Sequence, residues 1–127
     1  MEAEQIKKVV LAGAGTMGTS MSQIFAEKGY TTILYNHRAP KLEQARRMIA
    51  LNQQSLVESG DLTPEESENV KKRIVLTTDD ACFKDCDIVV ESIVENMDIK
   101  HEFWEKISGL VRDDTILATN TSGLSIT

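Results

Sequence analysis

An apolar strand that runs into a glycine-rich turn and then a helix is the feature that most restricts the fold of this chain. The segment is VVLAGAGTMG, residues 9–18. In a G-x-G-x-x-G turn, the first glycine makes the tight turn, the second lets the backbone approach a pyrophosphate and the third lets the helix pack closely on the strand. A strand precedes the turn and a helix follows it, so the motif predicts dinucleotide binding, with a purely structural turn as the alternative. The predicted contacts are Gly13, Gly15, Thr16, Met17 and Gly18.

The rest of the chain alternates short apolar segments with segments of helical periodicity. We expect strands at residues 6–12, 31–35, 73–77, 87–91 and 115–119. This alternation predicts an α/β fold, a doubly wound parallel sheet of the Rossmann type with right-handed crossovers. The implied strand order is 3-2-1-4-5, and the ligand crevice then lies between the first and fourth strands.

Two of the helical connections carry specific expectations. After the glycine turn, the apolar residues Met17, Met21, Ile24 and Phe25 fall on one face at helical spacing, which predicts a helix there. The connection between the second and third strands is longer than one crossover helix needs. We predict a two-helix excursion there, whose second helix begins at the capping sequence Thr63-Pro64-Glu65-Glu66.

Composition narrows the classes of partner. The chain has 127 residues and a net charge of −6, which fits one globular domain and argues against nucleic acid or an anionic membrane as the main partner. No apolar run approaches the length of a membrane span, and the acidic N-terminus lacks a signal sequence, so we expect a cytoplasmic protein. The C-x3-C spacing of Cys82 and Cys86 is no usual metal or redox motif. We therefore expect plain reduced thiols and no metal site.

The end of the second strand is where a carboxylate would bind the adenosine ribose of a dinucleotide. This chain has Asn36 there, with Arg38 two residues further on. Asn36 can still hydrogen-bond a ribose hydroxyl but does not repel a 2′-phosphate, and Arg38 could pair with that phosphate. The alternative is a polar turn with a solvated arginine. The sequence therefore predicts a dinucleotide and leaves NAD and NADP both open.

Two further polar segments follow the fourth and fifth strands. The fourth strand leads into ESIVEN, residues 91–96, and Lys100 lies one helical turn later. Because the fourth strand ends at the crevice, residues 91–96 would face the nicotinamide half of the cofactor, and Lys100 could reach the same cavity. The alternative, which the pattern alone favours, is that Glu95 and Lys100 are surface charges. The fifth strand leads into NTSGLSIT, residues 120–127, whose hydroxyl and amide groups suit either a substrate carbonyl or a helix cap.

Together these segments resemble the 3-hydroxyacyl-CoA dehydrogenases, including the bacterial 3-hydroxybutyryl-CoA dehydrogenases, over nearly the whole chain. The motifs that carry the resemblance are residues 13–18, 91–96 with Lys100, and 120–127. The resemblance implies that Glu95 and Lys100 contact the cofactor around its nicotinamide ribose. It also implies that Ser122 lies beside the nicotinamide and hydrogen-bonds the 3-oxygen of the substrate, as the one catalytic residue in this chain.

The resemblance implies a function in fatty acid and lipid metabolism. The complete oxidoreductase would interconvert L-3-hydroxyacyl-CoA and 3-ketoacyl-CoA by hydride transfer with NAD, and the two-helix excursion would help hold CoA. The family usually has aspartate at position 36, so Asn36 and Arg38 make NADP possible. Residues 1–127 would be the dinucleotide-binding domain alone. The catalytic histidine–glutamate pair and the helical domain that forms a homodimer or higher oligomer would lie beyond it, so this piece would bind cofactor but be inactive. The alternatives are a dehydrogenase for a sugar acid or small hydroxy acid, and a non-catalytic dinucleotide sensor.

Overall fold

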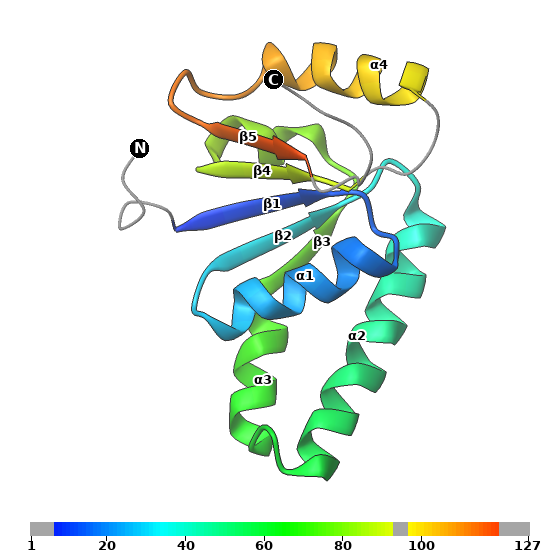
Figure 1. The fold of residues 1–127 in the computed structure, drawn as a ribbon, viewed down its shortest axis with the longest axis vertical. Coiled ribbons are helices and arrows are strands. Elements are labelled where there is room, and N and C mark those ends of the chain that lie inside the picture. The colour runs from blue at the N-terminus through cyan, green and yellow to red at the C-terminus, as the bar shows by residue number, and fades with distance from the viewer. Residues whose placement is uncertain (1–6, 93–96, 120–127) are drawn as a thin grey trace.

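Five parallel strands form one sheet in the order β3-β2-β1-β4-β5, and the computed structural model describes residues 7–92 and 97–119. The strands are β1 (Lys8–Ala12), β2 (Thr31–Tyr35), β3 (Ile74–Thr77), β4 (Ile88–Glu91) and β5 (Ile116–Thr119). All arrowheads in Figure 1 point toward the same edge of the sheet. The doubly wound parallel fold and the predicted strand order are therefore confirmed.

Helices cover both faces of this sheet. Helices α1 (Thr16–Glu27), α2 (Ala39–Ser59) and α3 (Pro64–Arg73) lie on one face, and α4 (Met97–Ser108) lies on the other (Figure 1). A short 3₁₀ helix, η2 (Asp80–Asp85), joins the second face and was not predicted. Alternation along β1 shows the two layers, because Val9 and Leu11 pack beneath α1–α3 while Val10 packs against the side of η2 and α4. Coverage on both faces explains why the middle positions of the strands are mostly apolar.

The predicted two-helix excursion between β2 and β3 is confirmed as α2 and α3. At the start of α3, the Glu66 N–H donates to the Thr63 hydroxyl at 3.1 Å, and the Thr63 N–H donates to the Glu66 carboxylate at 2.9 Å. This reciprocal capping box satisfies two backbone donors that the helix leaves unpaired. Gly60 ends α2 in the left-handed conformation, with φ of 85°.

The predicted helix after the glycine turn is confirmed as α1, but its large apolar residues are not its most buried ones. Met17 and Ile24 are about half exposed, at 55% and 49%, while Met21 and Phe25 are only partly buried. The helix instead buries a stripe of small residues spaced by four, namely Gly18, Ser22 and Ala26. Small side chains let the helix backbone approach the sheet closely, and this close approach outweighs the burial of the larger apolar groups.

Several buried polar groups of this helix region are hydrogen-bonded, whereas the buried Thr19 hydroxyl has no partner among the described residues. Within α1, Ser22 Oγ donates to the Thr19 carbonyl at 2.7 Å. The Gln53 side chain of α2 joins Gln23 of α1, at 2.7 Å, to Ser67 of α3, at 2.9 Å. Buried polar groups are tolerated when hydrogen-bonded, so this network specifies how the three helices pack. Within the described ranges, no helix is both long and apolar enough to cross a membrane.

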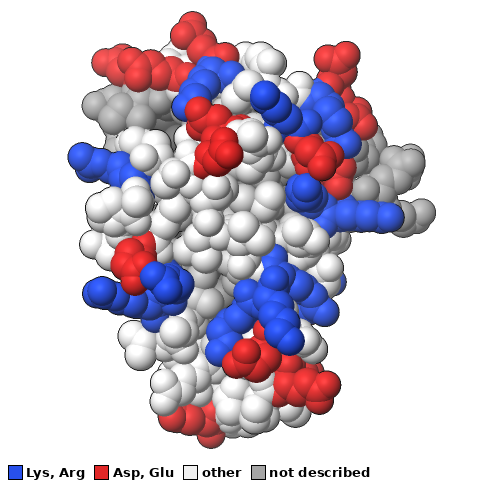
Figure 2. Space-filling model, turned by 180° about the vertical axis from the view of Figure 1, so that it is seen from behind, with Lys and Arg blue, Asp and Glu red and all other residues white. Residues whose placement is uncertain are grey.

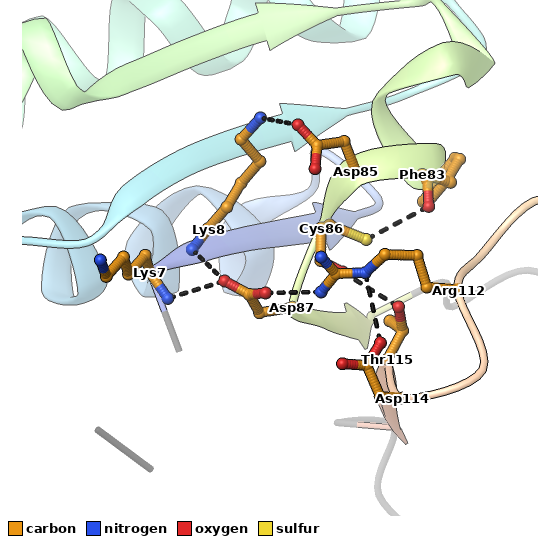
Figure 3. Close-up of polar contacts among 9 residues, drawn as sticks. All are labelled: Lys7, Lys8, Phe83, Asp85, Cys86, Asp87, Arg112, Asp114 and Thr115. Carbon is orange, nitrogen blue, oxygen red and sulfur yellow. Dashed lines mark hydrogen bonds and ion pairs between the residues drawn. The ribbon is translucent and has the colours of Figure 1, made fainter. Parts of the chain in front are cut away.

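The edge of the sheet where the strands begin is fastened by one carboxylate (Figure 3). Asp87 accepts the N–H groups of Lys7 and Lys8 at 2.8 and 3.0 Å, and it pairs with Arg112 at 2.6 Å. These contacts hold the starts of β1 and β4 to the connection that leads into β5. The two backbone donors, followed by the Arg112 guanidinium, lower the pKa of Asp87 to about 2 from its ordinary 3.8.

We predict that Asp87→Asn lowers the free energy of unfolding at pH 7 by roughly 1–3 kcal/mol, the range for charge-assisted hydrogen bonds. Because the folded-state pKa lies below the ordinary 3.8, the contribution of Asp87 is complete above that pH and is lost as pH falls through about 2. Urea unfolding followed by circular dichroism should therefore show a weaker acid dependence for the variant than for the wild type. Asp114 also pairs with Arg112 but is 61% exposed, so Asp114→Asn is the matched control. Equal stability of Asp87→Asn and wild type at pH 7 would contradict the prediction.

Candidate functional site

The glycine turn after β1 is held between the ends of two neighbouring strands. The Gly13 N–H donates to the Tyr35 carbonyl at the end of β2, at 2.9 Å. The Ser92 hydroxyl, just past β4, donates to the Gly13 carbonyl at 3.2 Å. Gly13 itself has φ of +115°, and a Cβ there would lie 3.0 Å from the Ser92 carbonyl oxygen. Both the backbone conformation and the space at this position therefore favour glycine.

Helix α1 begins directly on top of this turn. A Cβ at Gly18 would lie 2.0 Å from the Gly13 carbonyl oxygen and 2.9 Å from the Ser92 hydroxyl. No side chain larger than hydrogen fits without moving the helix or the turn. The absence of a side chain at Gly18 thus sets how close the helix N-terminus comes to the end of β1.

Gly15, at the start of α1, borders open space outside the protein. This residue is the N-cap, has extended backbone angles and supplies no capping side chain. A Cβ there would meet no protein atom within 4 Å. The first N–H groups of a helix have no partner inside the helix and carry partial positive charge. An uncapped helix start beside open space suits the diphosphate bridge of a dinucleotide, so the residues present fit that group.

Asn36 lies beside the glycine turn at the end of β2, where the sequence places the adenosine ribose. Its side chain is buried, accepts the Ala14 N–H at 3.4 Å and donates to the Arg38 carbonyl at 3.2 Å. Arg38, the N-cap of α2, is exposed. The structure therefore places Asn36 next to the predicted pyrophosphate turn, and Arg38 lies two residues further on at the protein surface.

Ser92 belongs to the predicted segment 91–96, but its contact with the glycine turn was not predicted. It is buried, and besides its contact with Gly13 its N–H donates to the Ala12 carbonyl at 2.9 Å. The signal available in the sequence was a serine directly after the fourth strand, at the crevice. Glu91, the last residue of β4, is fully buried beside it, in register with Ala12 of β1 and Thr119 of β5.

Several predicted residues have no described side chain. Glu95 and Ser122 lie outside the described residues, and Lys100 is described only as backbone, in the first turn of α4. Both cysteines are free thiols, as predicted. Burial raises the pKa of Cys82 to about 12 and that of Cys86 to about 11, which keeps both thiols protonated. The described residues contain no cluster of side chains suited to a metal ion.

A separate groove of about 520 Å³ lies between α2 and α3. The described residues that line it belong to these two helices and include the buried Gln53 and Ser67. Ion pairs along the same helices, such as Lys71 with Glu68, balance their charges. Figure 2 likewise shows charged groups of both signs around an uncharged middle on the face opposite that of Figure 1. The groove thus has a mixed apolar and polar lining with charges of both signs, unlike the positive helix start at the sheet edge.

Gly15, the N-cap of α1, and Gly18 in its first turn should respond differently to the same substitution. We predict that Gly18→Ala lowers the free energy of unfolding by roughly 1–3 kcal/mol or more, because a methyl group must displace backbone atoms. Gly15→Ala should change it by less than about 1 kcal/mol, because the new methyl group meets no protein atom. Urea unfolding of both variants beside the wild type measures the contrast. Equal effects of the two substitutions would mean that the helix does not rest on the turn.

Comparison with known proteins places this geometry in a family. The family model for the NAD-binding domain of 3-hydroxyacyl-CoA dehydrogenase matches residues 8–127. A probable 3-hydroxybutyryl-CoA dehydrogenase of Deinococcus radiodurans is 38% identical over 94% of this chain, and the chain covers 43% of that protein. The alpha subunit of the fatty acid oxidation complex of Psychrobacter arcticus is 33% identical over 99% of the chain, which covers 18% of it. The chain therefore spans less than half the length of these relatives.

Solved structures agree in fold. An (S)-3-hydroxybutyryl-CoA dehydrogenase of Ralstonia eutropha superposes with a TM-score of 0.92 at 31% identity, over 97% of this chain and 44% of the other. A 3-hydroxybutyryl-CoA dehydrogenase of Escherichia coli gives 0.91 at 32% identity, over 97% of this chain and 26% of the other. The chain thus belongs to the 3-hydroxyacyl-CoA dehydrogenase family, as its NAD-binding domain.

Proposed function

We propose that this domain serves an enzyme that interconverts L-3-hydroxyacyl-CoA and 3-ketoacyl-CoA with NAD. The observation that carries the proposal is the uncapped start of α1 beside Gly15, held at the crevice by the contact of Gly18 with Gly13. The names of the relatives support a CoA ester as substrate, because they are 3-hydroxybutyryl-CoA and 3-hydroxyadipyl-CoA dehydrogenases. NAD supplies the hydride acceptor when bound, and the protein supplies orientation and proton handling.

The glycine turn would hold the pyrophosphate. In this proposal, the N–H groups of the first turn of α1 bind the phosphate oxygens, with contacts from Gly13, Gly15, Thr16, Met17 and Gly18. These donors are oriented by the fold before the cofactor arrives, so little ordering accompanies binding. The exposed positions of Thr16 and Met17 leave this approach open.

The two ends of the cofactor would lie on either side of this turn. Asn36 and Arg38 follow β2 and would face the adenosine ribose, while Glu95 and Lys100 follow β4 and would contact the nicotinamide ribose. Ser122 follows β5 and would hydrogen-bond the 3-oxygen of the substrate. The order of the strands supports this arrangement, because β2 and β4 flank β1 and β5 lies beyond β4.

Oxidation of the substrate hydroxyl also needs a base to take its proton. The sequence contains two histidines, and the structure places both His37 and His101 on the surface, the first after β2 and the second on α4. We infer that the base comes from outside residues 1–127, so that this piece binds cofactor without turning over substrate. A cytoplasmic homodimer or higher oligomer is the form proposed for the complete enzyme.

We predict that the 127-residue chain binds NADH in a saturable manner, measured by nicotinamide fluorescence, and that Gly15→Val weakens binding by about tenfold or more. The added side chain would occupy the space proposed for the pyrophosphate. The control is Gly109→Ala, where a Cβ has its nearest contact at an ordinary 3.8 Å. Retained affinity in Gly15→Val would contradict the proposed site. With acetoacetyl-CoA added, NADH should stay unoxidised, and a dehydrogenase rate from the chain alone would contradict an outside base.

A further inference from the structure

We propose that the loop between β2 and α2 forms a subsite for the 2′-phosphate of NADP, so that this domain binds NADPH as well as NADH. The subsite consists of the Asn36 amide and the Arg38 guanidinium. The inference rests on the proposed function, because it assumes that a dinucleotide lies along the edge of the sheet.

The orientation of the Asn36 side chain is set by backbone groups on both sides. Its Oδ1 accepts the N–H of Ala14 in the glycine turn at 3.4 Å, and its Nδ2 donates to the Arg38 carbonyl at 3.2 Å. Its own N–H donates to the Thr77 carbonyl of β3 at 3.2 Å. With 8% of the residue exposed, Asn36 has little freedom to turn. The amide therefore ties the glycine turn to the loop that carries Arg38.

A carboxylate could not make the same contacts. Aspartate only accepts hydrogen bonds when ionised, so at position 36 one carboxylate oxygen would stand where Nδ2 now donates to the Arg38 carbonyl. Two acceptors would then face each other, and the loop would have to rearrange. The hydrogen bond to the Arg38 carbonyl therefore uses an amide at the place where NAD-binding folds put a carboxylate on the ribose 2′-hydroxyl. No negative charge remains there to repel a 2′-phosphate, and Nδ2 carries a second proton beyond the one that it donates to the Arg38 carbonyl.

Arg38 supplies positive charge that the described structure leaves uncompensated. Within residues 7–92 and 97–119, its guanidinium makes neither an ion pair nor a hydrogen bond, in a chain whose net charge is −6. The other arginines are engaged: Arg46 and Arg47 with Glu43, Arg73 with the Ala26 carbonyl, and Arg112 with Asp87. A planar guanidinium forms paired hydrogen bonds with a phosphate, so the free arginine beside Asn36 suits this ligand.

Paired titrations of the 127-residue chain with NADH and NADPH test the subsite. We expect the two dissociation constants to lie within about tenfold of each other in the wild type. Asn36→Asp should weaken NADPH binding about tenfold more than NADH binding, and Arg38→Gln should also weaken NADPH more than NADH. Lys28 is an exposed lysine at the far end of α1. The control Lys28→Gln should leave the ratio of the NADPH and NADH dissociation constants unchanged.

Shorter probes isolate the phosphate itself. Adenosine 2′,5′-bisphosphate should bind more tightly than adenosine 5′-monophosphate, and this advantage should shrink as salt is raised, because it is ionic. Because Asn36→Asp could disturb the loop, thermal unfolding of each variant is measured alongside binding. Arg38 is exposed, so Arg38→Gln tests the subsite without changing the buried Asn36. NADH binding with NADPH about a hundredfold weaker would overturn the subsite and leave the proposed function standing. Failure of both cofactors to bind would instead overturn the proposed function.

Discussion

The contact between the first turn of α1 and the Gly13 carbonyl determines the geometry of the binding edge. Because residue 18 has no side chain, the helix approaches the turn to a distance at which a Cβ would overlap the carbonyl oxygen. This approach brings the uncapped N–H groups of the helix to the end of β1, next to the ends of β2 and β4. A larger distance between residue 18 and the Gly13 carbonyl would move the start of α1 away from the crevice.

The neighbouring elements support this contact from two directions. Ser92 fastens the turn to β4, and the Gly13 N–H fastens it to β2, so the turn cannot move independently of the sheet. At the opposite edge, Asp87 holds the start of β1 beside the start of β4 by accepting the N–H groups of Lys7 and Lys8, and it pairs with Arg112. Rigid strands fixed at both ends are a suitable base for a site that depends on the positions of backbone donors. The side chains that differ among such sites, such as Asn36 and Arg38, then lie on loops at the margin.

Much of the fold could be predicted from the sequence because its signals are local. The strand order follows from apolar segments alternating with helices, and the capping box of α3 is visible in four consecutive residues. The buried face of α1 could not be predicted in this way, because its determinant is the closeness of the sheet, which favours Gly18 and Ser22 over Met17 and Ile24. The contact of Ser92 with Gly13 was not predicted for a similar reason, since the two residues are 79 positions apart in the chain. The roles of Glu95, Lys100 and Ser122 come from family resemblance and stay predictions.

In the proposed site, the main-chain amides at the start of α1 bind the diphosphate of the cofactor. The most direct test of this contact is a titration of the ¹⁵N-labelled chain with adenosine diphosphate, followed by backbone amide resonances. We expect the largest shifts at residues 14–18, while the amide resonances of Lys8 and Asp87 at the opposite edge of the sheet stay in place. Saturable binding that leaves the resonances of residues 14–18 unmoved would contradict it.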